Sequence, residues 1–245
     1  MIIIKLGGSI ITNKQKSLTV KLNRINKIVE KLKTVKEEII IIHGGGSFGH
    51  YWSLKYNMHT KPMKYNSHGI SIVKNSMVEL NKIILNAFFK TGFNPYVFPA
   101  SNFINVHGIP IIEKILEMKE ISKSGLVPIS YGDVLWRYKR RSYILSGDRI
   151  MTILSKIIKP RLAIFILNED GIYSNFAKKK LIYKLNNEKP DIKMINDSTG
   201  GIERKCNEAK QIQTLNVKVF FVNGNKPNRI IDAINNVRFV GTLLE

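Results

Sequence analysis

The chain has 245 residues, enough for one large α/β domain or for two closely packed lobes. Its 39 Lys and Arg residues against 18 Asp and Glu residues give a formal net charge of +21. The single cysteine, Cys206, excludes an internal disulfide, and no apolar run approaches the roughly 18 residues of a transmembrane helix. Lys5 interrupts the opening apolar run too early for a signal peptide, so we expect a cytoplasmic protein with no membrane partner.

The positive charge has two interpretations. A basic surface suits contacts with the phosphates of nucleic acid, whereas a composition rich in Lys, Asn and Ile explains the same total with solvated lysines. We favour the second, because the sequence contains no recognition helix, RNA-binding aromatic signature or zinc spacing. Between Glu38 and Glu79 no carboxylate occurs, although this stretch holds four of the five histidines. A segment that avoids negative charge suits an anionic ligand.

Strands and helices are predicted to alternate along the chain. In order, we expect a strand at 1–6, a helix at 20–35, a strand at 39–42, a helix at 66–91, strands at 95–98 and 126–130, a charged hairpin at 135–145, a helix at 149–158, a strand at 162–167, a loop or hairpin near 178–180, a helix from 200 to 215, a strand at 217–222 and a helix at 227–234. This alternation predicts a three-layer α/β/α sandwich around a mainly parallel sheet, with no linker or internal repeat.

Glycine turns fall at three points where a strand should hand over to a helix: Gly7–Ser9, Gly44–Gly49 and Gly200–Gly201. Free N–H groups at a following helix start favour phosphate, so the three turns together predict a polyphosphate site. A Walker A loop is absent from the sequence. The second turn matches a dinucleotide-binding fingerprint, but no acidic residue follows it before Glu79, which disfavours a dehydrogenase.

Seven short segments occur in the order typical of one superfamily. They are Lys5-Leu6-Gly7-Gly8-Ser9, His43-Gly44-Gly45-Gly46-Ser47-Phe48-Gly49-His50, Tyr131-Gly132-Asp133, Ser146-Gly147-Asp148, Asp170-Gly171-Ile172-Tyr173, Thr199-Gly200-Gly201 and Asn223-Gly224-Asn225. On these segments the chain resembles the amino acid kinase superfamily over nearly its whole length. Within it, the form resembles the isopentenyl phosphate kinases of the archaeal mevalonate pathway, and His50 is the most specific element.

The resemblance implies ATP-dependent phosphorylation of isopentenyl phosphate, with Mg²⁺ as the cofactor and a homodimer as the assembly. It also implies an acceptor-binding and dimerising lobe over about 1–145 and a nucleotide-binding lobe over about 146–245. A metal site built from protein side chains is not expected. The alternatives are a kinase for another phosphate or phosphonate such as fosfomycin, a kinase for a carboxylate, and a nucleic-acid-binding protein on a kinase scaffold.

Carried over by position, the resemblance assigns roles to individual residues. Lys5 and Lys205 flank the transferring phosphoryl group, Asp148 holds both lysines, and Lys14 stabilises the transition state. The ATP-binding set is Lys5, Gly7, Gly8, Ser9, Gly46, Asn168, Gly171, Gly201 and Lys205. The acceptor-binding set is Gly45, Gly46, His50 and Gly147.

One assigned role has a simpler alternative, and two positions differ from the family pattern. Asp148 lies at an expected helix start, where a carboxylate can serve only as an N-cap. Two positions depart from the family pattern: Asn168 replaces an Asp, and Arg149 replaces a second Asp and is expected to add positive charge beside the reaction centre. For the hydrocarbon tail, candidate pocket residues are Tyr51, Trp52, Tyr56, Ile72, Val73 and Met77.

Overall fold

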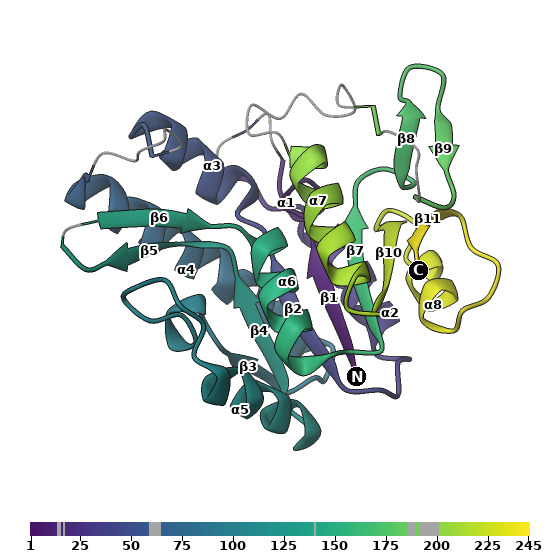
Figure 1. Cartoon of the computed structure of the whole chain (residues 1–245), viewed down its shortest axis with the longest axis horizontal. Coiled ribbons are helices and arrows are strands. Elements are labelled where there is room, and N and C mark those ends of the chain that lie inside the picture. Colours follow the sequence, from purple (N-terminus) through teal and green to yellow (C-terminus); the bar gives the residue numbers. More distant parts are fainter. Residues whose placement is uncertain (14–15, 17, 59–64, 140, 186–189, 192–200) are drawn as a thin grey trace.

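A single open sheet of seven strands organises the molecule (Figure 1). The computed structural model describes residues 1–13, 16, 18–58, 65–139, 141–185, 190–191 and 201–245. The strand order is β11-β10-β7-β1-β2-β4-β3, and every neighbouring pair is parallel except β10 with β11. The strands are β1 (Ile2–Leu6), β2 (Ile39–His43), β3 (Pro95–Val97), β4 (Val127–Tyr131), β7 (Leu162–Leu167), β10 (Lys218–Asn223) and β11 (Gly241–Leu244).

Helices cover both faces of this sheet. Side chains alternate along a strand, so Ile2 and Ile4 of β1 join one apolar core while Ile3 joins the other. The first core includes buried residues of α2 (Leu22–Leu32), α4 (Ser67–Lys90) and α8 (Asn228–Ile234). The second includes buried residues of α5 (Ile112–Lys123), α6 (Gly147–Ile158) and α7 (Gly201–Gln213). Because both faces are covered, the inner strands are apolar at almost every position.

The carboxyl ends of the parallel strands lie along one side of the sheet, where the chain passes from strands into helices. The short α1 (Gly8–Ile11) follows β1 directly, and α3 (Gly46–Lys55) follows β2. β1 lies between β2 and β7, where the order of winding reverses, and ligands of open α/β sheets bind outside the carboxyl ends of strands at such a point. Two antiparallel hairpins and a 3₁₀ turn complete the fold: β5 (Asp133–Arg137) with β6 (Arg141–Leu145), β8 (Ile172–Asn175) with β9 (Lys180–Ile182), and η1 (Ala100–Asn102).

The predicted fold class is confirmed. The hairpin expected at 135–145 forms, and the region near 178–180, expected as a loop or a hairpin, lies in a hairpin. The sequence led to no assignment for α1, η1, α5 and β11. In α5 the apolar pattern is blurred because Ile112 and Leu116 are exposed while Ile115 and Met118 are buried. Within the described ranges, no helix has both the length and the hydropathy that a membrane span requires.

Candidate active site

A buried ion pair lies near the carboxyl ends of the central strands. Lys5 of β1 places its Nζ 2.7 Å from Oδ1 of Asp148, in the first turn of α6. The side chains are only 4% and 3% exposed. Burying a charged pair costs free energy unless the geometry is good and further hydrogen bonds satisfy both groups. The pair therefore marks a position where the fold maintains charge within the interior.

Two more cations approach the same carboxylate from α7. Lys205 Nζ and Arg204 Nε each lie 3.6 Å from Oδ2 of Asp148. Lys205 also donates a hydrogen bond of 2.9 Å to the carbonyl of Gly201, at the start of its own helix. We call Lys5, Asp148, Arg204 and Lys205 the charged centre. Sequence reasoning singled out all of them except Arg204, whose approach depends on how α7 packs on α6.

The pKa values of the charged centre reflect its crowding. Burial, together with the neighbouring cations Lys205 and Arg204, lowers the pKa of Lys5 to about 8 despite the nearby Asp148. Burial acts to raise the pKa of Asp148, but Lys205 and Lys5 together outweigh it and hold that pKa well below its usual range. The carboxylate is therefore charged at neutral pH, and Lys5 still carries its proton there.

Asp148 is not the N-cap of its helix. The Ser146 side chain performs that function by accepting a hydrogen bond from the Arg149 N–H, at 3.1 Å. Asp148 lies inside the first turn and is used for the lysines, so the capping alternative is wrong. The Arg149 guanidinium contacts Gln211 at 3.0 Å and Glu208 at 3.4 Å, both on α7. The charge expected beside the reaction centre is thus paired with a carboxylate on the neighbouring helix.

The first two glycine turns touch each other beside this centre. A Cβ atom on Gly8 would lie 2.6 Å from the backbone N of Gly46, and Gly46 has a positive φ of 49°, so neither position accepts a side chain easily. Thr12 joins the turns, since its hydroxyl donates to the Gly8 carbonyl at 2.8 Å and accepts from the Ser47 N–H at 2.9 Å. These two hydrogen bonds fix the backbone of one turn relative to the other, as a phosphate-binding site requires.

Gly147 connects the glycine turns to the charged centre. A Cβ atom there would lie 3.0 Å from Cε of Lys5 and 3.2 Å from the carbonyl of His43. A side chain at this position would displace the lysine from Asp148. Gly45, also predicted to contact the acceptor, would bring a Cβ within 3.1 Å of Sδ of Met77 on α4. The predicted acceptor-side glycines thus lie between the charged centre and α4.

Two histidines flank the second glycine turn in different ways. His50 lies on α3, half-buried, and its carbonyl accepts a hydrogen bond from Ser53. His43 is fully buried at the end of β2, where it stacks on Tyr131 with 5.1 Å between ring centroids. Its Nε2 lies 3.2 Å from Oδ1 of Asn81 on α4. Burial lowers the pKa of His43 to about 4, so its ring is neutral at pH 7 and serves to fix the turn.

The predicted tail pocket lies where α3 packs against α4. Val73 and Met77 are buried in the core, and Trp52 and Tyr56 pack against it while Tyr51 is largely exposed. The Trp52 and Tyr56 rings stack at 6.1 Å between centroids. These side chains provide an apolar wall next to the second glycine turn, although whether they contact a ligand stays a prediction.

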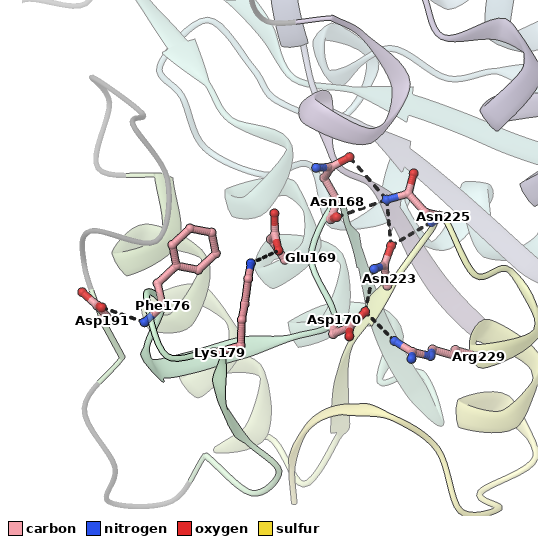
Figure 2. Close-up of polar contacts among 9 residues, drawn as sticks. All are labelled: Asn168, Glu169, Asp170, Phe176, Lys179, Asp191, Asn223, Asn225 and Arg229. Atoms are coloured by element: carbon pink, nitrogen blue, oxygen red, sulfur yellow. Dashed lines mark hydrogen bonds and ion pairs between the residues drawn. The ribbon is translucent and has the colours of Figure 1, made fainter.

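A second polar cluster occupies the ends of β7 and β10 (Figure 2). Asp170 Oδ1 accepts hydrogen bonds from Asn223 at 2.7 Å and from Arg229 at 2.6 Å. Asn225 donates to the carbonyl of Asn168 at 3.1 Å. Burial acts to raise the pKa of Asp170, but the bonds from Asn223 and Arg229 lower it overall. We call Asn168, Asp170, Asn223, Asn225 and Arg229 the strand-end network.

Asn168, which departs from the family pattern, is built into this network. Its Oδ1 accepts a hydrogen bond of 2.9 Å from Arg24 at the start of α2. Asn225 also donates to this oxygen, at 3.4 Å, so the Asn168 side chain acts as an acceptor within the network. Gly171, predicted to line the nucleotide pocket, is buried with its Cα facing Thr242 of β11, where a Cβ would lie 2.6 Å from Oγ1.

The structure thus brings Lys5, Gly8, Gly46, Gly147, Asp148 and Lys205 together at the carboxyl ends of β1 and β2. Lys14 and Gly200 lie outside the described residues, as does the predicted turn residue Thr199. Within the described part of the chain, no group of three His, Cys, Asp or Glu side chains could hold a metal ion. Sequence reasoning gave no site role to three residues that contact distant segments of the chain: Arg204, Thr12 and His43.

An open, doubly wound α/β sheet with glycine turns and clustered cations at its switch point defines a phosphate-binding enzyme of the kinase type. Residues 1–223 match the model of the amino acid kinase family, and the chain belongs to that family. The resemblance inferred from the seven sequence segments is therefore confirmed.

Two relatives and one solved structure that match nearly the whole chain carry the same name. The chain is 33% identical to an isopentenyl phosphate kinase of Thermoplasma acidophilum over all of both chains. It is 29% identical to one of Methanocaldococcus jannaschii, over 95% of this chain and 94% of that protein. A crystal structure of a T. acidophilum isopentenyl phosphate kinase product complex superposes with a TM-score of 0.85 and 31% identity, covering 100% of both chains. A Neisseria gonorrhoeae N-acetylglutamate synthase matches at 10% identity with a TM-score of 0.71, which shows the shared fold alone.

Proposed function

We propose that the protein transfers the terminal phosphoryl group of ATP to isopentenyl phosphate, giving isopentenyl diphosphate and ADP. The observation that carries the proposal is the charged centre, where three cations surround one carboxylate beside two glycine turns. Relatives that match over all or nearly all of their length carry the name of this activity. The reaction would serve an archaeal-type mevalonate pathway in the cytoplasm.

The chemistry requires charge neutralisation more than proton removal. Phosphoryl transfer passes through a loose transition state, so the enzyme mainly positions the reactants and stabilises negative charge. A phosphate acceptor is already an anionic nucleophile near neutral pH and needs no general base. Asp148 is bound to Lys5 and is not available as such a base. Its proposed task is to hold Lys5 and Lys205 on either side of the transferred group.

The remaining predicted residues divide between the two substrates. The backbone of Gly7, Gly8, Ser9 and Gly46 would bind the phosphates of ATP, while Gly45, His50 and Gly147 would bind the acceptor phosphate. The proposed nucleotide pocket includes Asn168 and Gly201, with Gly171 supporting its wall. The two lobes, 1–145 and 146–245, would then supply the acceptor and nucleotide sides respectively.

Mg²⁺ is proposed as a part of the ATP substrate. The carboxylate of the charged centre is bound to lysine and does not provide a protein ligand set. A magnesium ion on the phosphates would reduce their negative charge. The protein's own residues would orient those phosphates through backbone N–H groups and the cations of the charged centre.

A homodimer is proposed from the acceptor-side lobe. Large apolar side chains are exposed on α4, β3 and α5, among them Phe89, Tyr96 and Ile112, which are 59%, 42% and 59% exposed. Exposed apolar side chains on neighbouring elements are typical of an association surface. Sedimentation velocity would test this, since a single species with the mass of one chain would contradict it.

The experiment that tests the function is a comparison of acceptors. ADP release would be measured with isopentenyl phosphate, fosfomycin, glutamate and carbamate at equal concentrations. We expect the highest kcat/KM with isopentenyl phosphate. A preference for another acceptor would replace the proposal with a related kinase activity, and tight salt-sensitive binding of DNA or RNA without ATP turnover would favour a nucleic-acid-binding protein.

A further inference from the structure

Arg204 is the member of the charged centre that is accessible to a ligand. It precedes Lys205 in the first turns of α7, and both side chains lie 3.6 Å from the same carboxylate oxygen of Asp148. Their exposure differs: the side chain is 38% exposed in Arg204 and 12% exposed in Lys205. Arg204 is therefore anchored near Asp148 at its Nε while part of its side chain reaches solvent.

One hydrogen-bond donor of Arg204, its Nε, is not used by the described residues. Its Nε is buried and has no hydrogen-bond partner among the described residues, because 3.6 Å to Asp148 is too long for such a bond. A buried N–H without a partner costs free energy. The guanidinium presents several donors in a planar fork that matches the oxygens of a phosphate. The Arg204 guanidinium therefore has N–H groups that could donate to an anionic ligand.

The charge at this position is also uncompensated. Lys5 already occupies the other oxygen of Asp148 at 2.7 Å, so the charged centre carries two more positive than negative charges. The start of α7 adds the positive end of a helix dipole. Arg149 makes a useful contrast, because its guanidinium reaches Glu208 and Gln211 instead. Among the described residues, Asp148 is the one carboxylate that pairs with Arg204, so an added anion would balance the remaining positive charge.

We propose that Arg204 is a further catalytic residue, which binds an oxygen of the phosphoryl group during its transfer from ATP. This inference rests on the proposed kinase function. Arg204 shares its helix and its carboxylate with Lys205, so the two side chains would contact the same phosphate. That phosphate is the terminal one of ATP, and ADP lacks it. Arg204 therefore contributes more to the binding of ATP than to the binding of ADP.

The test compares nucleotide binding by three variants of the full chain. Arg204→Gln removes the charge, Arg204→Lys keeps it without the fork, and Arg238→Gln removes an exposed charge from the loop before β11 as the matched control. Isothermal titration calorimetry with MgATP and with MgADP gives the dissociation constants. We expect Arg204→Gln to weaken ATP roughly 10- to 100-fold and ADP by less than about threefold. Arg204→Lys should lie between, and Arg238→Gln should match the wild type.

Thermal unfolding distinguishes this role from a structural one. Removing one of three crowded cations should leave the Tm of the ligand-free Arg204→Gln variant unchanged or higher. Equal loss of ATP and ADP affinity together with a lower Tm would overturn the proposal, as would wild-type affinity for ATP. These results are independent of the acceptor. A wild-type protein that binds ATP but does not phosphorylate isopentenyl phosphate would instead contradict the proposed function.

Discussion

The charged centre and the strand-end network lie at the same edge of the sheet, yet they are balanced differently. In the strand-end network, Asp170 is matched by Arg229 and by the Asn223 amide, at 2.6 and 2.7 Å (Figure 2). In the charged centre, Asp148 faces three cations, two of them at 3.6 Å. A balanced cluster holds backbone segments in place, whereas a cluster with surplus charge needs a ligand to complete it. The comparison supports the charged centre as the proposed phosphate site.

Removing each carboxylate in turn is the strongest way to break this comparison. Asp148→Asn should lower kcat roughly 100- to 1,000-fold, because Lys5 and Lys205 lose the group that positions them for the transition state. Asp170→Asn is the matched control, and we expect a smaller effect because the amide can still accept hydrogen bonds from its partners. Steady-state kinetics with saturating ATP measures both. Equal losses in the two variants would show that the clusters do not differ in function.

His50 sharpens the comparison by separating acceptor binding from phosphoryl transfer. His50→Ala should lower kcat/KM for the acceptor roughly 10- to 100-fold, as expected for loss of one hydrogen bond to a charged group. The dissociation constant for ATP should stay within about twofold of wild type. His107→Ala, at an exposed loop position, is the control. Wild-type acceptor kinetics in His50→Ala would remove this histidine from the mechanism.

The pKa of Lys5 gives the comparison a pH dependence. Because this pKa is lowered from 10.5 to about 8, kcat/KM should fall about tenfold per pH unit above pH 8 as the lysine loses its charge. In the unfolded chain Lys5 keeps its proton up to about pH 10.5. Between these values the unfolded state binds more protons, so the contribution of Lys5 to the free energy of unfolding rises with pH. The Arg204→Gln variant should move the activity limb to higher pH, since a neighbouring cation is removed.

Activity and the contribution of Lys5 to stability are thus expected to change in opposite directions. A pH-rate profile and chemical denaturation at matched pH values measure the two. If activity and the free energy of unfolding fell together above pH 8, the loss of activity would be due to unfolding. A profile that stays flat to pH 10 would show that Lys5 does not act as a cation in the reaction.

Local patterns in the sequence were sufficient to predict most of the fold. The apolar runs at β1, β2 and β7 and the helical period of α2 and α4 each lie within one segment. The short β11 was missed because its four residues gain their strand identity from pairing with β10. In the same way α5 was missed because exposed Ile112 and Leu116 interrupt its apolar stripe. Elements defined by their partners are harder to predict than elements defined by their own period.

The site residues were predicted one by one from the family resemblance. The structure adds their partners and side-chain directions, which depend on packing. Ser146 rather than Asp148 caps α6, which the adjacent sequence letters could not decide. The contact between His43 and Asn81 joins residues 38 positions apart. Arg204 and Arg149 are both basic residues beside predicted catalytic positions, but only Arg204 turns towards Asp148. Side-chain direction depends on how α6 and α7 pack together.

A crystal structure with ADP and isopentenyl diphosphate tests the central claim most directly. We expect phosphate oxygens within about 3 Å of Lys5, Arg204 and Lys205, with the strand-end network unchanged. The contradicting result would be phosphates bound elsewhere, for example in the basic groove between α2 and α8 that Lys27, Lys31 and Lys226 line, while the charged centre remained without an anion.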